Sequence, residues 1–342
     1  MPPATSATRP RRRRSDLAQK QAREKQATQK QEPRAVDLQA AAEGPTETGP
    51  GRGPEELLAQ AAEVAQVVAG HGRSDLAGGA AGEIAHWQEL VRASTALRVG
   101  VDLGTASCVL VVLATDDAGR ERPVWVDSYA SGALRDGVVV DFAKATATVR
   151  RLKETAEQAL GVELASAATA YPPCIPVKDA RACTYVCESA GFDEVVLVDE
   201  VTAAQRTLEV RDGVVVDVGG GSTGVGVFRD GELVKLDDRP GGGHHLDLML
   251  AGAMGIPLED AEPYKRTYPR ESFPLLVPGL QRIAENVRAL TTGDEELPLH
   301  LAGGALMIAG AGDVLAKYLE RTVVTYPHPL LITPIGIARS AA

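Results

Sequence analysis

The sequence is poor in aromatic residues and has no long hydrophobic run. Aromatic residues make up 4% of the 342 residues, so a buried core must be built from Val, Leu, Ile and Ala. No run of about 18 apolar residues occurs, and no apolar segment follows the arginine-rich start. We therefore expect neither a membrane span nor a secretory signal, and we expect a cytoplasmic protein.

Cysteine is also scarce, and its placement indicates no disulfide framework. The four cysteines, Cys108, Cys174, Cys183 and Cys187, lie in or beside apolar runs, as in proteins of a reducing compartment. Cys183 and Cys187 are spaced to share a helix face. Without a histidine pair nearby in the sequence, buried thiols are favoured over a metal site there.

Only the start of the chain has a net positive charge. Residues 1–53 contain 11 Lys/Arg against 6 Asp/Glu, a balance of +5, which leaves −15 on the rest of a chain whose net charge is −10. An acidic body is not typical of a nucleic-acid-binding protein. Residues 1–53 have few large apolar residues, which predicts a disordered basic tail; a solvated tail is favoured over a specific anionic partner.

The sequence has no Gly-x-x-x-x-Gly-Lys-Ser/Thr motif, which excludes a P-loop. Two other glycine turns each follow an aspartate at the end of a short β-branched run: Asp102-Leu-Gly104-Thr105 and Asp217-Val-Gly-Gly-Gly-Ser-Thr223. Two such hairpins facing each other would offer backbone N–H groups and hydroxyls to one polyphosphate. Their aspartates would hold a hydrated divalent cation. The pair therefore predicts a nucleotide site.

The second turn fits two other motifs as well. Gly220–Gly224 matches the nucleophile elbow Gly-x-Ser-x-Gly, and Gly219–Gly224 matches the dinucleotide pattern Gly-x-Gly-x-x-Gly. Both motifs require a helix next. The following residues alternate in polarity and contain Asp230-Gly231, a typical hairpin turn, so we expect strands instead.

Two short amphipathic helices are predicted before the first of these hairpins. An apolar stripe at Leu57, Ala61, Val64 and Val68 belongs to a helix from Pro54 to Gly70. The second stripe comprises Ile84, Trp87, Leu90 and Val91. Such short helices need a partner surface. For the first stripe, the body of this chain and another protein are equal alternatives; for the second, docking on the body is favoured.

From residue 97 the pattern alternates between strands and helices, as in an α/β fold. Besides the hairpins, we expect strands at 124–129, 138–140, 165–171, 194–198, 298–301 and 323–325. We expect helices at 143–160, 177–190, 202–208, 259–265, 277–289 and 311–319, one after Pro334, and one that follows Gly241–Gly243 and ends near Ala253.

Five motifs in order resemble those of the actin, Hsp70 and sugar-kinase superfamily of ATPases over residues 97–342. They are the two hairpins at Asp102 and Asp217, Asp199-Glu-Val-Thr-Ala-Ala204, Leu301-Ala-Gly-Gly-Ala-Leu306 and Pro334-Ile-Gly-Ile-Ala338. The resemblance implies an actin-like α/β fold. Its two lobes would be duplicated ribonuclease-H-like mixed sheets flanked by helices, with domain I at 97–222, domain II at 223–325 and a return to domain I at 326–342. Residues 1–53 and 54–96 would form an extension.

The resemblance also implies roles for individual residues. Asp102 and Asp217 would hold Mg²⁺ through water, and Glu200 would orient the attacking water, which makes these three the catalytic candidates. The residues expected to contact ATP are Gly104, Thr105, Ala106, Gly219, Gly220, Gly221, Ser222, Thr223, Glu262, Lys265, Gly303, Gly304 and Ala305.

Three departures from the superfamily pattern bear on turnover. Val201 replaces the usual proline, Met307 stands where the Hsp70 branch has an arginine, and the catalytic lysine of Hsp70 has no clear counterpart. We expect nucleotide binding to survive these changes better than hydrolysis.

Within the superfamily the chain resembles the ethanolamine-utilisation protein J (EutJ) family. The segments that carry the likeness are 135–141, 169–173, 179–181, 199–204, 240–244, 250–253 and 328–336. This resemblance implies a nucleotide-dependent chaperone or assembly role in an ethanolamine bacterial microcompartment. The implied client is a protein, with ethanolamine ammonia-lyase and shell proteins as candidates. His244 and His245 start a helix in this family, so we interpret them as structural.

Two other functions remain open on this fold. An actin-like scaffold or filament protein would use hydrolysis only to time disassembly. A small-molecule kinase would need an insert in domain I to enclose its substrate, and only a short segment separates Thr105 from Leu160. Whether the chain is an Mg-dependent ATPase depends on a turnover that the sequence does not fix.

Overall fold

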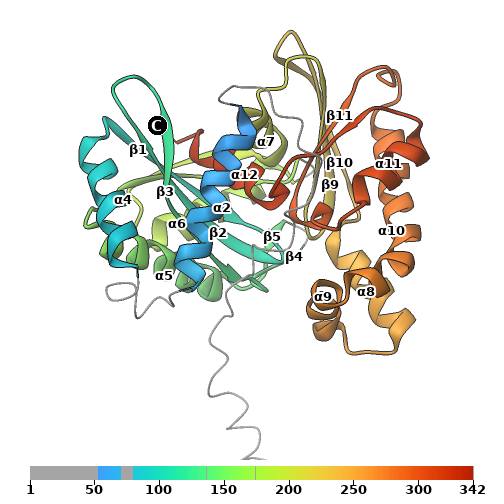
Figure 1. The fold of residues 1–342 in the computed structure, drawn as a ribbon, viewed down its shortest axis with the longest axis horizontal. Coiled ribbons are helices and arrows are strands. Elements are labelled where there is room, and N and C mark those ends of the chain that lie inside the picture. Colours follow the sequence, from blue (N-terminus) through green and yellow to red (C-terminus); the bar gives the residue numbers. More distant parts are fainter. Residues whose placement is uncertain (1–52, 71–79, 136, 174, 342) are drawn as a thin grey trace, which may run out of the picture. The chain divides into compact units, whose positions relative to one another are not determined.

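The computed structural model describes residues 53–70, 80–135, 137–173 and 175–341. The predicted tail at 1–53 lies almost entirely outside these residues, as does Cys174. Figure 1 shows the described helices and strands. None of these helices combines the length and the apolarity that crossing a bilayer requires.

The first sheet has five strands in the order β3-β2-β1-β6-β7. They are β1 (Ala96–Leu103), β2 (Ser107–Thr115), β3 (Glu121–Ala130), β6 (Ser166–Tyr171) and β7 (Glu194–Asp199). The first three strands form an antiparallel meander, whereas β6 runs parallel to β1 and β7 parallel to β6. A separate small ladder joins β4 (Leu134–Arg135) to β5 (Val138–Val139).

The second sheet repeats this topology in the order β10-β9-β8-β11-β12. Its strands are β8 (Gly213–Val218), β9 (Ser222–Arg229), β10 (Glu232–Pro240), β11 (Leu299–Ala302) and β12 (Val323–Val324). Again an antiparallel meander is followed by two parallel strands. The duplicated mixed sheet is therefore confirmed. The second sheet begins at β8, before the domain boundary expected after Ser222.

Helices separate and flank the strands. They are α2 (Pro54–Gly70), α4 (Ala81–Ala93), α5 (Phe142–Leu160), α6 (Val177–Ser189), α7 (Glu200–Leu208), α8 (Gly243–Met254), α9 (Leu258–Thr267), α10 (Pro269–Leu290), α11 (Ala311–Leu319) and α12 (Pro329–Ala338). Most agree with the predicted spans. The left-handed Gly161, for example, ends α5 where expected.

Two helices start earlier than predicted. We expected α10 to begin near Val277 and the last helix after Pro334, but α10 begins at Pro269 and α12 at Pro329. Both helices have a proline in the first turn, where the missing N–H is not needed, and further prolines inside the helix. Helix α12 thus accommodates Pro334, which the prediction took as its boundary, and α10 accommodates Pro274 and Pro278.

The glycine turns lead into strands rather than helices. β9 follows the second turn, and the residues Asp230 and Gly231 that join β9 to β10 have φ angles of 54° and 86°. Positive φ at both central residues characterises the tight turns that match strand twist. The nucleophile-elbow and dinucleotide interpretations are thus wrong.

The two N-terminal helices pack on the first sheet. α2 lies against β3 and buries Leu58 and Ala61 completely (Figure 1). In α4, Trp87 makes an edge-to-face contact with Trp125 of β3, with ring centroids 6.1 Å apart. The alternative in which α2 docks on the body of its own chain is therefore confirmed.

Helices α7 and α12 cross at very close range. A Cβ atom at Gly336 would lie only 1.6 Å from the carbonyl oxygen of Ala203, so only glycine fits at this crossing. Beside it, the Thr207 hydroxyl donates to the carbonyl of Ile332 at 2.7 Å. This contact fixes α12 on α7.

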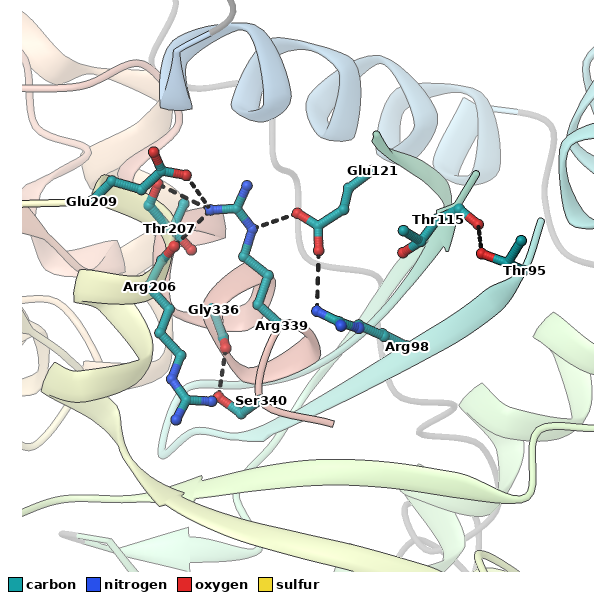
Figure 2. A network of polar contacts seen from close by, with 10 residues as sticks. All are labelled: Thr95, Arg98, Thr115, Glu121, Arg206, Thr207, Glu209, Gly336, Arg339 and Ser340. Carbon is teal, nitrogen blue, oxygen red and sulfur yellow. Dashed lines mark hydrogen bonds and ion pairs between the residues drawn. The ribbon is translucent and has the colours of Figure 1, made fainter. Parts of the chain in front are cut away.

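An arginine at the end of α12 reinforces the crossing (Figure 2). Arg339 donates from Nε to Glu121 of β3 at 2.7 Å and from Nη1 to the carbonyl of Arg206 at 2.6 Å and to Glu209 at 3.1 Å. Glu121 also pairs with Arg98 of β1 at 3.4 Å. The network joins α12 to α7 and to the first sheet.

Candidate functional site

Three predicted acidic residues come from equivalent places in the fold. Asp102 is the penultimate residue of β1, and Asp217 is the penultimate residue of β8. Glu200 is the first residue of α7. Because the two sheets have the same topology, both aspartates precede a glycine turn at the end of the first strand of a meander.

Burial raises the pKa values of all three acids, and repulsion by neighbouring carboxylates adds to the rise for Asp102 and Glu200. Burial, together with the negative charge of Asp217, raises the pKa of Asp102 to about 7. Burial raises the pKa of Asp217 to about 6, although a hydrogen bond from Thr333 opposes that rise. The pKa of Glu200 lies well above its usual range because of burial and then the charges of Asp217 and Asp102. The three acids therefore form one electrostatically coupled cluster.

The described residues give two of these acids no neutralising partner. Neither the carboxylate of Asp102 nor that of Glu200 accepts a hydrogen bond or joins an ion pair within them. The cap of α7 is the preceding residue, Asp199, whose carboxylate accepts the amide of Thr202 at 2.7 Å. Glu200 is thus not the helix cap, and its carboxylate is left for another role.

The two glycine turns lie against each other. A Cβ atom at Gly220 would be 3.3 Å from Cβ of Thr105 and 3.4 Å from the amide nitrogen of Ala106. The structure therefore brings together the first and second predicted phosphate turns, at the ends of strands that carry Asp102 and Asp217.

Several amides of these turns are available to a ligand. Within the described residues, no hydrogen bond uses the amides of five turn residues: Gly104, Thr105, Ala106, Gly220 and Gly221. The amide of Gly219 donates inside its own turn to Ser222 at 3.1 Å. The hydroxyl of Thr223 donates to Gly241 at 2.6 Å. The fold itself thus uses these two predicted donors.

The carbonyls of the second turn are held by the start of α8. Gly219, Gly220 and Gly221 accept from the amides of Gly243, His244 and Gly241 at 2.9, 2.8 and 2.9 Å. With the carbonyl oxygens so engaged, the turn keeps its remaining N–H groups for an anion. This contact also gives His244 a structural role through its backbone.

The predicted adenosine turn adjoins Asp217. Ala302 pairs with Asp217 across β11 and β8, and Gly303 follows with a φ of 98°. A Cβ atom at Gly303 would lie 2.5 Å from Oδ1 of Asp217. The two residues after Gly303 also make close contacts: Gly304 lies against Leu330, and Ala305 lies against Gly243.

The predicted base and ribose contacts are in an ion cluster on α8 and α9. Lys265 pairs with Asp247 at 2.8 Å and with Glu262, and Arg266 pairs with Glu262 at 2.7 Å. No contact of the described residues joins this cluster to Asp102 or Glu200. Glu262 and Lys265 thus pair with each other and with α8, whose first residues bond the second glycine turn.

Sequence reasoning missed Thr333. Its hydroxyl, on α12, donates to Oδ2 of Asp217 at 2.7 Å, and both side chains are buried. The only sequence signal is a polar residue within the apolar helix Pro329–Ala338.

Val201, which stands where the superfamily usually has a proline, packs against two glycines of β9. Cγ atoms of Val201 would be 2.9 Å and 2.5 Å from Cβ atoms built at Gly224 and Gly226 of β9. The valine fills the space that these glycines leave, so α7 packs closely on the second sheet.

The donor set fits a hydrated divalent cation and a polyphosphate. Among the described residues no three His, Cys, Asp or Glu side chains are close enough to hold a metal ion directly. The buried acids suit contact through water, and the amides of the turns suit phosphate oxygens. Cys108, Cys183 and Cys187 are buried free thiols.

Comparisons with known proteins agree with this architecture. The MreB/Mbl protein family model matches residues 129–252. The EutJ ethanolamine utilization protein of Salmonella typhimurium is 39% identical over 247 residues, which cover 72% of this chain and 86% of that protein.

Solved structures give the same assignment. The crystal structure of EutJ from Carboxydothermus hydrogenoformans has a TM-score of 0.67 at 39% identity and covers 74% of this chain and 98% of that chain. MreB5 of Spiroplasma citri bound to ADP has a TM-score of 0.57 at 15% identity, over 71% of this chain and 95% of that chain, which shows a shared fold. The chain therefore has the actin-like fold and belongs to the EutJ family of ethanolamine utilization proteins.

Proposed function

We propose that this chain binds Mg-ATP between its two glycine turns and acts as a nucleotide-dependent chaperone or assembly protein in ethanolamine utilisation. The observation that carries the proposal is the trio of Asp102, Glu200 and Asp217, the last buried and the other two partly buried, beside five unused turn amides. A site with excess negative charge and free N–H donors suits a cation and a phosphate chain together. The fold shared with the ADP-bound MreB5 supports the same ligand class.

The proposed role of each residue follows from the charge or the hydrogen-bonding group that it contributes. Asp102 and Asp217 would hold the waters of Mg²⁺, and the amides of the two turns would bind phosphate oxygens. Magnesium would neutralise charge on the phosphates. Glu200, with a raised pKa and no capping role, would orient and deprotonate the attacking water.

The biological role rests on family membership. The relatives are named ethanolamine utilization proteins. We infer that the client is a protein of that system, with ethanolamine ammonia-lyase and microcompartment shell proteins as candidates, and that the chain works in association with the microcompartment. A client that accelerates phosphate release would favour this role, whereas ATP-dependent sedimentation of the chain alone would favour the actin-like scaffold.

Magnesium-dependent nucleotide binding can be tested by thermal unfolding. Saturating ATP with Mg²⁺ should raise the melting temperature clearly, because a ligand at a hundred times its Kd adds about 2.7 kcal/mol to the free energy of unfolding. Asp217→Asn should weaken this response. Asp116→Asn, a substitution on the exposed β2–β3 turn, is the matched control and should keep it. An unmoved melting curve of the unmodified chain in Mg-ATP would refute the proposal.

Hydrolysis should depend on Glu200. Glu200→Gln should retain the Mg-ATP-dependent rise in melting temperature yet release phosphate about a hundredfold more slowly, since a water-orienting carboxylate acts mainly in the transition state. Asp199→Ala is the contrasting variant. It removes the helix cap and should lose roughly 1 kcal/mol of stability without a comparable loss of turnover. Equal rates in Glu200→Gln and the unmodified chain would remove Glu200 from the mechanism.

A further inference from the structure

Each carboxylate oxygen of Asp217 has a close neighbour. Oδ2 accepts a hydrogen bond from Thr333 at 2.7 Å, and both residues are buried, with 6% and 5% of their surfaces exposed. Oδ1 faces Gly303, where a Cβ atom would lie only 2.5 Å away. Because Gly303 has no side chain, no Cβ atom fills the space beside Oδ1, while Thr333 occupies Oδ2.

Helix α12 holds both of these neighbours. The amide of Gly303 donates to the carbonyl of Pro329, the first residue of α12, at 3.0 Å. One residue before Thr333, Ile332 accepts the hydroxyl of Thr207 from α7 at 2.7 Å. The hydroxyl of Thr333 is thus anchored in a packed helix rather than on a loop.

Asp102 lacks such support. It occupies the equivalent place in the first sheet, yet within the described part of the chain no hydroxyl or amide donates to its carboxylate. The hydrogen bond from Thr333 is therefore a specific feature of the second aspartate and does not follow from the duplicated topology.

We propose that Thr333 is a positioning residue that fixes the carboxylate of Asp217 so that Oδ1 accepts a water of the magnesium shell. This inference rests on the proposed Mg-ATP function. It assigns to α12 a direct effect on magnesium affinity, through one hydroxyl, that is separate from its packing on α7.

The test measures the Mg²⁺ concentration that gives half of the ATP-dependent rise in melting temperature. Thr333→Val should raise this concentration at least about tenfold, the factor that corresponds to losing a hydrogen bond to a charged group. Thr333→Ser keeps the hydroxyl and should stay near the unmodified chain. Thr207→Val is the matched control: it removes a buried threonine hydroxyl on the same helix pair and should lower the melting temperature without ligand while it leaves the Mg²⁺ midpoint unchanged.

The outcomes separate this inference from the function on which it rests. If Thr333→Val and Thr207→Val have the same Mg²⁺ midpoint, Thr333 is only a packing residue and the inference is wrong. If Thr333→Val does not fold, Thr333→Ala compared with Thr333→Ser decides the matter in the same way. If the unmodified chain shows no response to Mg-ATP, both the proposed function and this inference are refuted.

Discussion

The acidic residues of the site destabilise the protein that holds them. Asp102 and Glu200 are partly buried, with raised pKa values and without a neutralising partner among the described residues. A chain selected for stability alone would have replaced them with neutral side chains. Their unfavourable burial is what makes the site attractive to a cation.

Replacing Asp102 with Asn should therefore stabilise the nucleotide-free protein at high pH. The folded-state pKa of about 7 lies above the ordinary value of 3.8, so full stability is present below 3.8 and is lost as the pH rises through 7. Asn does not ionise. Denaturation should show a gain on the order of 4 kcal/mol at about pH 8 and almost none near pH 4.

Asp116→Asn is the control, because its effect on stability at high pH should have the opposite sign to that of Asp102→Asn. The amides of Arg120 and Ala118 hold the pKa of Asp116 below its usual value. Its contribution is present above the unfolded pKa and is lost as the pH falls, so this variant should lose stability at pH 8. The same response in both variants would contradict the electrostatic account of Asp102.

The role of a residue could be predicted from the sequence where that role depends on its neighbours in the chain. Asp102 and Asp217 precede glycine turns at strand ends, which the sequence displays directly. Thr333 acts on a residue 116 positions away, and that contact depends on where α12 begins. The amide of Gly219 and the hydroxyl of Thr223 were predicted donors to a ligand, but the tight turn and the following glycine segment use both.

At the scale of elements, the N-terminal helices belong to the first sheet. The stripe on α2 and the tryptophan of α4 are buried against β3, together with Trp125. The sequence predicted the limits of α2 correctly because Pro54 and Gly70 mark them. The sequence did not decide which surface α2 docks on, because periodicity shows which face of a helix is apolar but not what covers that face.

Truncation distinguishes the two parts of the extension. Removing residues 1–52 should leave the melting temperature and the Mg-ATP response unchanged, since the candidate site lies between Asp102 and Thr333. Removing residues 1–93 should lower the melting temperature strongly, because burial of a single Leu-sized side chain contributes about 1.5–3 kcal/mol. Thermal unfolding and co-purification with shell or lumen proteins are the measurements.

The shorter truncation also tests a separate role for the tail. We propose that residues 1–52 serve location or partner binding, so co-purification should fall when they are removed while nucleotide binding persists. Unchanged co-purification would show that the tail is not needed for location. Equal stability of the chain that starts at residue 94 would contradict the packing of α2 and α4.

At the scale of the whole molecule, the repeated strand order places two similar turns where one ligand can use both. The duplicated sheets were predicted through the resemblance of five ordered motifs to the actin, Hsp70 and sugar-kinase superfamily, and the strand orders confirm them. The ion cluster of Lys265 could not be predicted. Its pairing with Asp247 depends on how α8 packs against α9.

The topology also sets an order of events during synthesis. Leu331, Ile332 and Ile335 belong to the same core as the strands of the first sheet, although more than a hundred residues separate them in the chain. A ribosome delivers α12 after every strand that it covers, so that core stays incomplete in the nascent chain until residues 329–338 have emerged. Because Thr333 arrives with that helix, the second aspartate acquires its hydrogen bond only after α12 has emerged.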